Sequence, residues 1–408
     1  MKLKLLSIGD QVEPGAYRFH SCFDHVVNFE RDGRLLSVVD EPVGPGPLNI
    51  VFSLNNTPLQ RGGRAPAGEL NPESFRDFPP GAKPADLQET VKTVKDFHPP
   101  GRTPLKRGVN ESAPHETGTY QEILGLPSPP ALEIGRNTIT FAGCGFRFSP
   151  RHRYQSTIVL KPTILHRFQR NLRTFGESLQ GSAPPKSLAF LLDDTRLANF
   201  QTKSERAFAA HMAHSVHQVF HGHLLQGIRS LKGCGPGLTP SGDDFIAGLL
   251  VGLHVLGQLE SAPDRSGVQS RTLRANPTAS ERAQRPGLRQ SSGAFEKGLV
   301  FLFEASLSGQ PGAGSRSCQA LADAIFSAAR GRNLFSNTFL DLARQGRFVG
   351  RVKDLLLTLA TGDKPTVRRA TQRLLAIGAS SGADLATGFC FTIDRIWVHS
   401  DPIAAAAH

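Results

Sequence analysis

The hydrophobic pattern of this chain changes once along its length, and that change limits the folds available to it. Up to about residue 160, short apolar runs alternate with turn signals, as in "YRFHSCFDHVVNFE", "RDGR" and "LLSVVD". From residue 161 on, apolar residues recur at helical spacing, as at Ile164, Phe168, Leu172 and Phe175. Strands followed by helices predict an α+β fold. We expect a β-rich domain over residues 1–160 and a mostly helical domain over residues 161–408.

Two stretches break these patterns. Residues 56–130 and 261–292 are polar and rich in proline, glycine or arginine, with no hydrophobic period. Such composition cannot bury enough apolar surface to offset ordering entropy, so both are expected to be disordered insertions. The second stretch holds six arginines against two acids, a net +4 of the chain's +12. Because this charge lies in a loop-like stretch with no interleaved aromatic residues, we expect no nucleic-acid partner.

The remaining composition predicts a cytoplasmic protein. Five cysteines are scattered singly, which argues against a disulfide framework or a zinc site. The basic N-terminus reaches Gly9 and Asp10 too soon for a signal peptide. The longest apolar run, residues 245–256, is too short to span a bilayer, so no membrane association is expected.

The segment "GCGPGLTPSGDDFIAGLLVG", residues 233–252, is the strongest candidate for a functional site. Thr239 is a good N-cap and Pro240 suits the first position of a helix. Gly233, Gly235 and Gly237 permit unusual backbone angles before it. Free N–H groups at a helix start attract anions, and we expect those of residues 237–242 to do so. No Lys-Ser/Thr pair follows the last glycine, so a nucleotide-binding loop is not implied.

Two adjacent acids occupy the first turn of this predicted helix. Asp243 and Asp244 point about 100° apart, so they cannot serve one face. One complements the helix dipole, and the other, Asp244, is expected to reach into a site. Gly248 and Gly252, four residues apart, predict a buried helix that packs closely on a neighbour.

A shorter echo of the segment occurs near the C-terminus. "SGDDFIAG" at residues 241–248 aligns with "SGADLATG" at residues 381–388, so that Asp244 pairs with Asp384 and Ala383 replaces Asp243. Ordinary helix capping explains such an echo as well. The functional hypothesis is that two helix N-termini meet pseudo-symmetrically around one small anionic ligand, with Asp244 and Asp384 on facing sides.

Two further groups of polar residues stand out. The run "GRNLFSNTFLDLA" interrupts helical periodicity with amides and hydroxyls, which form caps and turns or contact a substrate. Five histidines between residues 211 and 223 suggest a metal, but a partly exposed polar face is the favoured interpretation. We therefore assign no metal ligands.

The candidate site combines these segments. Its predicted catalytic residues are Asp244, Asp243 and Asp384. Its predicted substrate- or anion-binding residues are Gly235, Gly237, Thr239, Ser241, Gly242, Ser380, Ser381, Gly382, Asn333, Ser336, Asn337 and Thr338.

The opening segment resembles the signature of a bacterial domain family, long of unknown function, that includes the AllH subunit of oxamate carbamoyltransferase. The blocks "GPGPLNIVF" (residues 44–52), "NLFSNTFLDLARQG" (residues 333–346) and "IGASSGADLATGF" (residues 377–389) are similar to weaker motifs of that family, in the same order. Family members are usually shorter, in agreement with two insertions. The long central insertion and the "GAD" of the echo depart from the family pattern.

The resemblance implies a transferase subunit of ureide or purine (allantoin) nitrogen catabolism. Its three-subunit enzyme interconverts oxalurate plus phosphate with oxamate plus carbamoyl phosphate, which implies other subunits as partners. In such chemistry Asp244 and Asp384 would bind the carbamoyl NH2 or a magnesium ion, the one cofactor candidate. The alternative is a non-catalytic scaffold or small-anion-sensing subunit of a metabolic complex.

Overall fold

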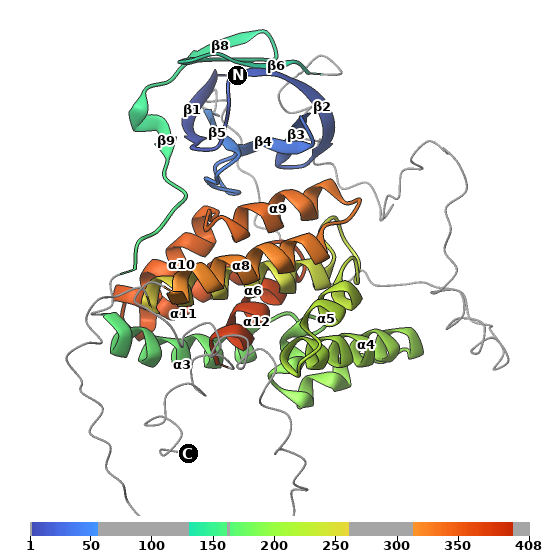
Figure 1. Cartoon of the computed structure of the whole chain (residues 1–408). Helices are drawn as coiled ribbons and strands as arrows, with labels where there is room; N and C mark the ends of the chain where they lie inside the picture. Colours follow the sequence, from blue (N-terminus) through green and yellow to red (C-terminus); the bar gives the residue numbers. More distant parts are fainter. Residues whose placement is uncertain (1, 56–129, 161–163, 261–312, 395–408) are drawn as a thin grey trace, which may run out of the picture. The chain divides into compact units, whose positions relative to one another are not determined.

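The computed structural model describes residues 2–55, 130–160, 164–260 and 313–394 (Figure 1). These residues belong to one compact unit made of Met1–Asn55 and Gly118–His408. The predicted insertions at residues 56–130 and 261–292 lie outside the described residues, apart from Pro130. The segment "GAFEKGLVFLFEASL", residues 293–307, whose apolar spacing predicts a helix, also lies outside them. Among the described helices, none is both long and apolar enough to cross a bilayer.

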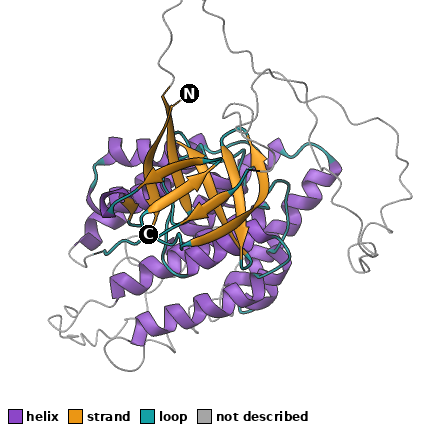
Figure 2. Cartoon of the chain, turned by 90° about the horizontal axis from the view of Figure 1, so that it is seen from above, coloured by secondary structure: helices purple, strands orange, loops and turns teal. Residues whose placement is uncertain are grey.

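The described N-terminal strands form one nine-stranded sheet in the order β8-β7-β6-β2-β3-β4-β5-β1-β9, and it is strongly curved (Figures 1 and 2). Most neighbours are antiparallel; β4–β5 and β1–β9 are parallel. Its strands are β1 Lys2–Gly9, β2 Gly15–Phe23, β3 Val26–Arg31, β4 Arg34–Asp40, β5 Asn49–Asn55, β6 Leu132–Ile134, β7 Thr138–Phe141, β8 Cys144–Arg147 and β9 Arg153–Tyr154.

The expected turn at "RDGR" joins β3 to β4. Asp32 and Gly33 both have positive φ, 51° and 72°, as a two-residue hairpin turn requires. The segment "YQSTIVL", residues 154–160, has the composition of a strand, which predicts one there. This prediction is wrong beyond its first residue, because β9 ends at Tyr154 and the next residues are irregular.

From Leu165 onward the described chain is helical, so the α+β expectation is confirmed. Its α-helices are α3 Leu165–Ser182, α4 Lys203–Phe220, α5 Leu224–Leu231, α6 Ser241–Glu260, α8 Ala313–Ala329, α9 Leu334–Arg344, α10 Gly350–Thr361, α11 Lys364–Leu375 and α12 Ser381–Ile393. The apolar segment "FCFTI", residues 389–393, is compatible with either a helix or a strand by its sequence. In the structure it continues α12.

One helix of the sequence prediction is in fact two. The apolar spacing of residues 207–231 predicts one continuous helix. In the structure this segment breaks at Gly222, whose φ is 91°, between α4 and α5. The break lets α5 fold back on α4, and a Cβ on Gly227 would lie 2.6 Å from the Val219 nitrogen. Apolar periodicity continues across the break because both helices bury a face in one core, so the pattern did not reveal it.

The core of the helical region is the pair α6 and α12. Phe245, Leu249 and Leu253 of α6 are fully buried. The two backbones touch at reciprocal glycines: a Cβ on Gly248 would lie 2.0 Å from the Leu385 carbonyl oxygen, and one on Gly388 would lie 2.1 Å from that of Phe245. The expected close packing is confirmed, and these positions are the ones that the sequence echo aligns.

We predict that Gly248→Ala and Gly388→Ala each lower the free energy of unfolding by about 1–3 kcal/mol, because the added methyl would overlap a backbone carbonyl of the partner helix. Gly176→Ala in α3 is the control: its Cβ would meet nothing within 4 Å, so a gain of about 0.5–1 kcal/mol is expected. Urea denaturation measures both effects. Equal stabilities for the three variants would show that the helices do not touch as described.

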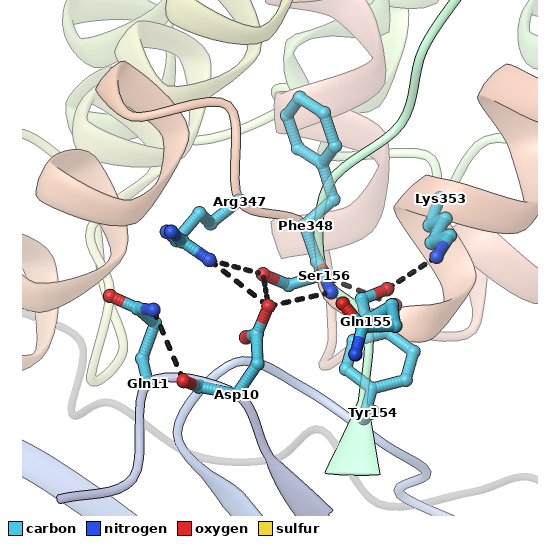
Figure 3. A network of polar contacts seen from close by, with 8 residues as sticks. All are labelled: Asp10, Gln11, Tyr154, Gln155, Ser156, Arg347, Phe348 and Lys353. Atoms are coloured by element: carbon cyan, nitrogen blue, oxygen red, sulfur yellow. Dashed lines mark hydrogen bonds and ion pairs between the residues drawn. The ribbon is translucent and has the colours of Figure 1, made fainter.

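A polar network joins the sheet to the helices (Figure 3). Asp10, directly after β1, accepts hydrogen bonds at Oδ2 from the Ser156 amide at 3.1 Å, the Ser156 hydroxyl at 2.9 Å and Arg347 Nη1 at 3.0 Å. Tyr154 donates its hydroxyl proton to the Phe348 carbonyl at 3.0 Å. The end of β1 is therefore tied to the loop between α9 and α10.

We predict that Asp10→Ala lowers the free energy of unfolding by about 1–3 kcal/mol, since it leaves the buried Ser156 and the Arg347 guanidinium without their shared acceptor. Asp354→Ala is the matched control: its ion pair with Arg373 is long, at 3.9 Å, and exposed, so a change under about 0.5 kcal/mol is expected. Thermal unfolding of the variants decides this, and a neutral Asp10→Ala would contradict it.

Candidate functional site

The loop before α6 has the glycine conformations that its sequence suggests. Gly233, Gly235 and Gly237 have φ of 72°, 113° and 102°, a region that favours glycine. The helix begins at Ser241, one residue later than expected, and Asp243 and Asp244 both donate their amides to the Pro240 carbonyl, at 2.9 and 3.0 Å.

Asp243 closes this loop. Its Oδ1 accepts the Gly233 amide at 2.8 Å, and the residue is only 4% exposed. The carboxylate thus fixes the start of the loop to the first turn of α6. Asp243 therefore has a structural role, unlike Asp244 beside it, whose carboxyl hydrogen-bonds Thr239 and Ser381.

The second glycine of each motif is a packing position. A Cβ on Gly242 would lie 1.9 Å from the Leu231 carbonyl oxygen, and one on Gly382 would lie 2.0 Å from that of Leu374. Their amides are also engaged, with Cys234 O at 2.8 Å and Ile377 O at 3.0 Å. Gly242 and Gly382 therefore have no N–H group to offer an anion, contrary to expectation.

The starts of α6 and α12 meet directly. The hydroxyls of Thr239 and Ser381 are 3.2 Å apart, although 142 residues separate them. Ser381, at the start of α12, hydrogen-bonds Asp244 of α6. In the same way Ser241, at the start of α6, hydrogen-bonds Asp384 of α12. Each motif's serine thus binds the other motif's aspartate, in a pseudo-two-fold exchange.

Asp384 is the enclosed member of the pair. It is fully buried, and its oxygens accept the Leu188 amide at 2.6 Å and the Ser380 hydroxyl at 2.9 Å. Burial raises its pKa to about 6, against the lowering effect of the hydrogen bonds from Leu188, Ser241 and Ser380. At neutral pH this carboxyl is ionised and held by these donors.

Asp244 is the member with residual exposure, 9%. Burial raises the pKa of the Asp244 carboxyl to about 8. Hydrogen bonds from Ser381 and from the Thr239 hydroxyl, which donates at 3.2 Å, oppose this rise, whereas the charge of Asp384 adds to it. At pH 7 Asp244 therefore keeps its proton, and the pair carries one negative charge.

Only part of the expected amide row remains free. The amides of Gly237, Leu238 and Thr239 donate to no acceptor among the described residues, whereas those of residues 242–244 are engaged. Thr239 is not the N-cap of α6 that its sequence suggests, because its hydroxyl donates to the Asp244 carboxyl.

The polar residues of the segment "GRNLFSNTFLDLA" contact two different parts of the structure. Asn333 caps α9 by accepting the Ser336 amide at 3.2 Å, and its Nδ2 donates to the Leu238 carbonyl at 2.7 Å, so it touches the loop before α6. Asn337 exchanges two hydrogen bonds with Gly331. Thr338 accepts the Leu35 amide of β4 at 3.4 Å and lies away from the aspartate pair. The Ser336 hydroxyl is buried and has no partner in the described structure.

The histidine group of α4 is a local feature. His211 contacts the Ser230 carbonyl at 3.0 Å, and the rings of His217 and His221 lie 4.0 Å apart. Within the described ranges, no three His, Cys, Asp or Glu side chains converge as a metal site would require.

Sequence reasoning missed the partner that fixes Asp384. The Leu188 amide belongs to the 3₁₀ helix η3, Leu188–Leu191, and a backbone donor leaves no mark in a sequence. Ser380 could be found, because an N-cap serine four residues before an acid is a local pattern.

We predict that Asp244 makes stability fall as pH rises from about 4 to about 8. The folded pKa lies above the unfolded value of 3.8, so the contribution is complete below pH 4 and lost by pH 8. Asp244→Asn removes this loss; relative to wild type it should gain up to about 1.4 kcal/mol per pH unit between pH 5 and 8. Urea denaturation across this range measures the difference.

The control is Asp363→Asn. Hydrogen bonds from Thr366 lower the pKa of Asp363, so its contribution is present above the unfolded pKa and is lost only as pH falls below it. Its difference from wild type should stay constant between pH 5 and 8. A constant difference for Asp244→Asn as well would contradict the raised pKa.

The chain was compared with protein families, curated proteins and solved structures. The family model of oxamate carbamoyltransferase subunit AllH matches residues 231–324 and 303–393. No curated protein and no solved structure gave a significant match. The matched residues include the loop before α6, the start of α9 and the start of α12, but not the block at residues 44–52. The resemblance to the AllH family is therefore confirmed for the part of the chain that carries the two aspartates.

Proposed function

We propose that this chain is a subunit of a carbamoyltransferase-type enzyme, and that the starts of α6 and α12 form its reaction site for a small anionic substrate. The matched family is named for a subunit of oxamate carbamoyltransferase, which supports the reaction class and the presence of other subunits. In that reaction oxalurate and phosphate give oxamate and carbamoyl phosphate, in a cytoplasmic pathway of ureide nitrogen catabolism.

The observation that carries the proposal is the unequal pair of buried carboxyls. Asp244 and Asp384 occupy equivalent places at two helix starts, yet Asp384 is fully enclosed and Asp244 keeps a small exposed surface and a pKa of about 8. An acid that is protonated at neutral pH and can still release its proton suits general acid catalysis. Environments that set two carboxyls apart in this way are typical of catalytic sites.

The proposed step uses that proton. A phosphate oxygen attacks the carbamoyl carbon of oxalurate, and the bond from this carbon to the amide nitrogen breaks. The departing nitrogen needs a proton to leave as the neutral amide of oxamate, and Asp244 supplies it. The proton lost from phosphate then restores Asp244, so charge and atoms balance. Asp384 acts as a positioning residue through Ser241, and its charge adds to the effect of burial, which raises the pKa of Asp244.

The free amides beside Asp244 supply the anion-binding part. Those of Gly237, Leu238 and Thr239 lie in the loop that leads to α6, and Asn333 holds that loop through the Leu238 carbonyl. Backbone N–H groups near a helix start stabilise phosphate or carboxylate oxygens. A neutral Asp244 also avoids repelling such an anion, which an ionised carboxylate would do.

The alternative is a non-catalytic scaffold or anion-sensing subunit. The packing role of Gly242, Gly248, Gly382 and Gly388 favours it, because each of these motif glycines is required by a backbone contact. In that case the motifs would be retained for the fold, and Asp244 would affect stability alone.

We predict that Asp244→Asn lowers kcat by about 10²–10⁴-fold in the complex reconstituted with its partner subunits, because the amide cannot supply the proton. Carbamoyl phosphate formed from oxalurate and phosphate is the measurement. Asp354→Asn, an exposed residue of α10, is the control and should keep full activity. Full activity of Asp244→Asn would exclude Asp244 as the general acid and favour the non-catalytic scaffold.

Ser381→Ala separates a catalytic from a structural role. The Ser381 hydrogen bond lowers the pKa of Asp244, so its removal should raise that pKa. Activity that depends on protonated Asp244 falls as pH rises past about 8, and this limb of the pH–rate profile should move to higher pH in the variant. A profile that keeps its shape would contradict the general acid.

A further inference from the structure

A cavity separate from the aspartate pair lies between α5 and α8. It has a volume of about 450 Å³ and is lined by Leu225, Arg229, Lys232, Ala324, Ser327 and Ala328. Cavities of this size hold small molecules. The two helices are in contact, and both are seen in Figure 1.

Among the residues that the structure describes, the lining of the cavity carries positive charge and includes no acid. Arg229 and Lys232 supply two cations, and the other four residues are apolar or hydroxylic. The acid next to the lining in sequence, Asp323, is committed to Arg344 at 2.6 Å. Arg229 makes no hydrogen bond or ion pair with any residue that the structure describes. A guanidinium on a concave surface without a partner is a donor for a carboxylate or phosphate.

Lys232 makes one hydrogen bond that orients its ammonium. Its Nζ donates to the Arg330 carbonyl at 3.0 Å, which leaves two further N–H bonds of the ammonium. The next residue after Arg330, Gly331, lies against the Lys232 stem, and a Cβ built on it would be 3.6 Å from Lys232 Cδ. A fixed ammonium loses little entropy when it binds an anion.

The cavity therefore offers a fixed ammonium, an uncommitted guanidinium and the Ser327 hydroxyl beside a small apolar wall. We propose that it binds the oxyanion group, phosphate or carboxylate, of a small ligand through Arg229 and Lys232. The site goes beyond the proposed reaction site, because it uses neither aspartate of the pair and none of the free amides.

The test is isothermal titration of the full chain with inorganic phosphate and, in a second arm, with acetate. The double variant Arg229→Gln/Lys232→Gln should weaken binding of the preferred anion by about ten-fold or more, since two charge-assisted contacts are lost. The double variant Lys203→Gln/Arg206→Gln on α4 removes the same number of charges from exposed positions and serves as the matched control, with an expected change under about two-fold. Asp244→Asn, which alters only the proposed reaction site, is titrated in parallel.

The outcomes separate this site from the reaction site. Binding that is weakened only in Arg229→Gln/Lys232→Gln supports the cavity as the site. The anion that binds more tightly, phosphate or acetate, identifies the ligand group as phosphate or carboxylate. Equal loss of binding in Lys203→Gln/Arg206→Gln would show that net charge alone explains the effect and would overturn the proposal. Binding that survives Arg229→Gln/Lys232→Gln but fails in Asp244→Asn would place the anion at the aspartate pair and also overturn it. Failure of both anions to bind would overturn it as well.

Discussion

The contact of two helix backbones, α6 against α12, is the constraint on which the rest of the helical region depends. Gly248 and Gly388 let a carbonyl of each helix lie where any side chain would have been. At this separation the first turns of both helices share one small volume. Thr239 then reaches Ser381, and each serine reaches the aspartate of the other motif. The buried acids are thus a consequence of the packing, and their pKa values follow from their burial.

Asp244 and Asp384 occupy nearly symmetric positions, so the differences between their hydrogen-bond donors explain their different protonation. Two equivalent acids in equivalent surroundings would compete for one proton. Here Asp384 has the Leu188 amide and the Ser380 hydroxyl as donors in addition to Ser241, whereas Asp244 has two hydroxyls. More donors favour ionisation, so the negative charge settles on Asp384 and the proton on Asp244. The contacts from Leu188 and Ser380, both outside the echo, decide which acid is available for chemistry.

The sequence predicted what local patterns encode. Gly248 and Gly252 indicated a tightly packed helix, Asp32 and Gly33 a hairpin turn, and the echo the pairing of Asp244 with Asp384. It did not predict the break at Gly222, because apolar spacing continues across it, nor the engagement of the Gly242 amide by Cys234. The donor from Leu188 and the cavity at Arg229 arise from tertiary contacts between distant segments, which no local pattern records.

The burial of α6 has a consequence for the order in which the chain matures. Its closest neighbour, α12, begins 121 residues after α6 ends, counting from Glu260 to Ser381. Since synthesis proceeds from the N-terminus, the apolar run of α6, residues 245–256, emerges well before the helix that covers it. Contacts of such long sequence separation form slowly. The nascent chain must therefore expose α6 for the time needed to translate the remainder, which makes this helix the segment that a chaperone would be expected to bind.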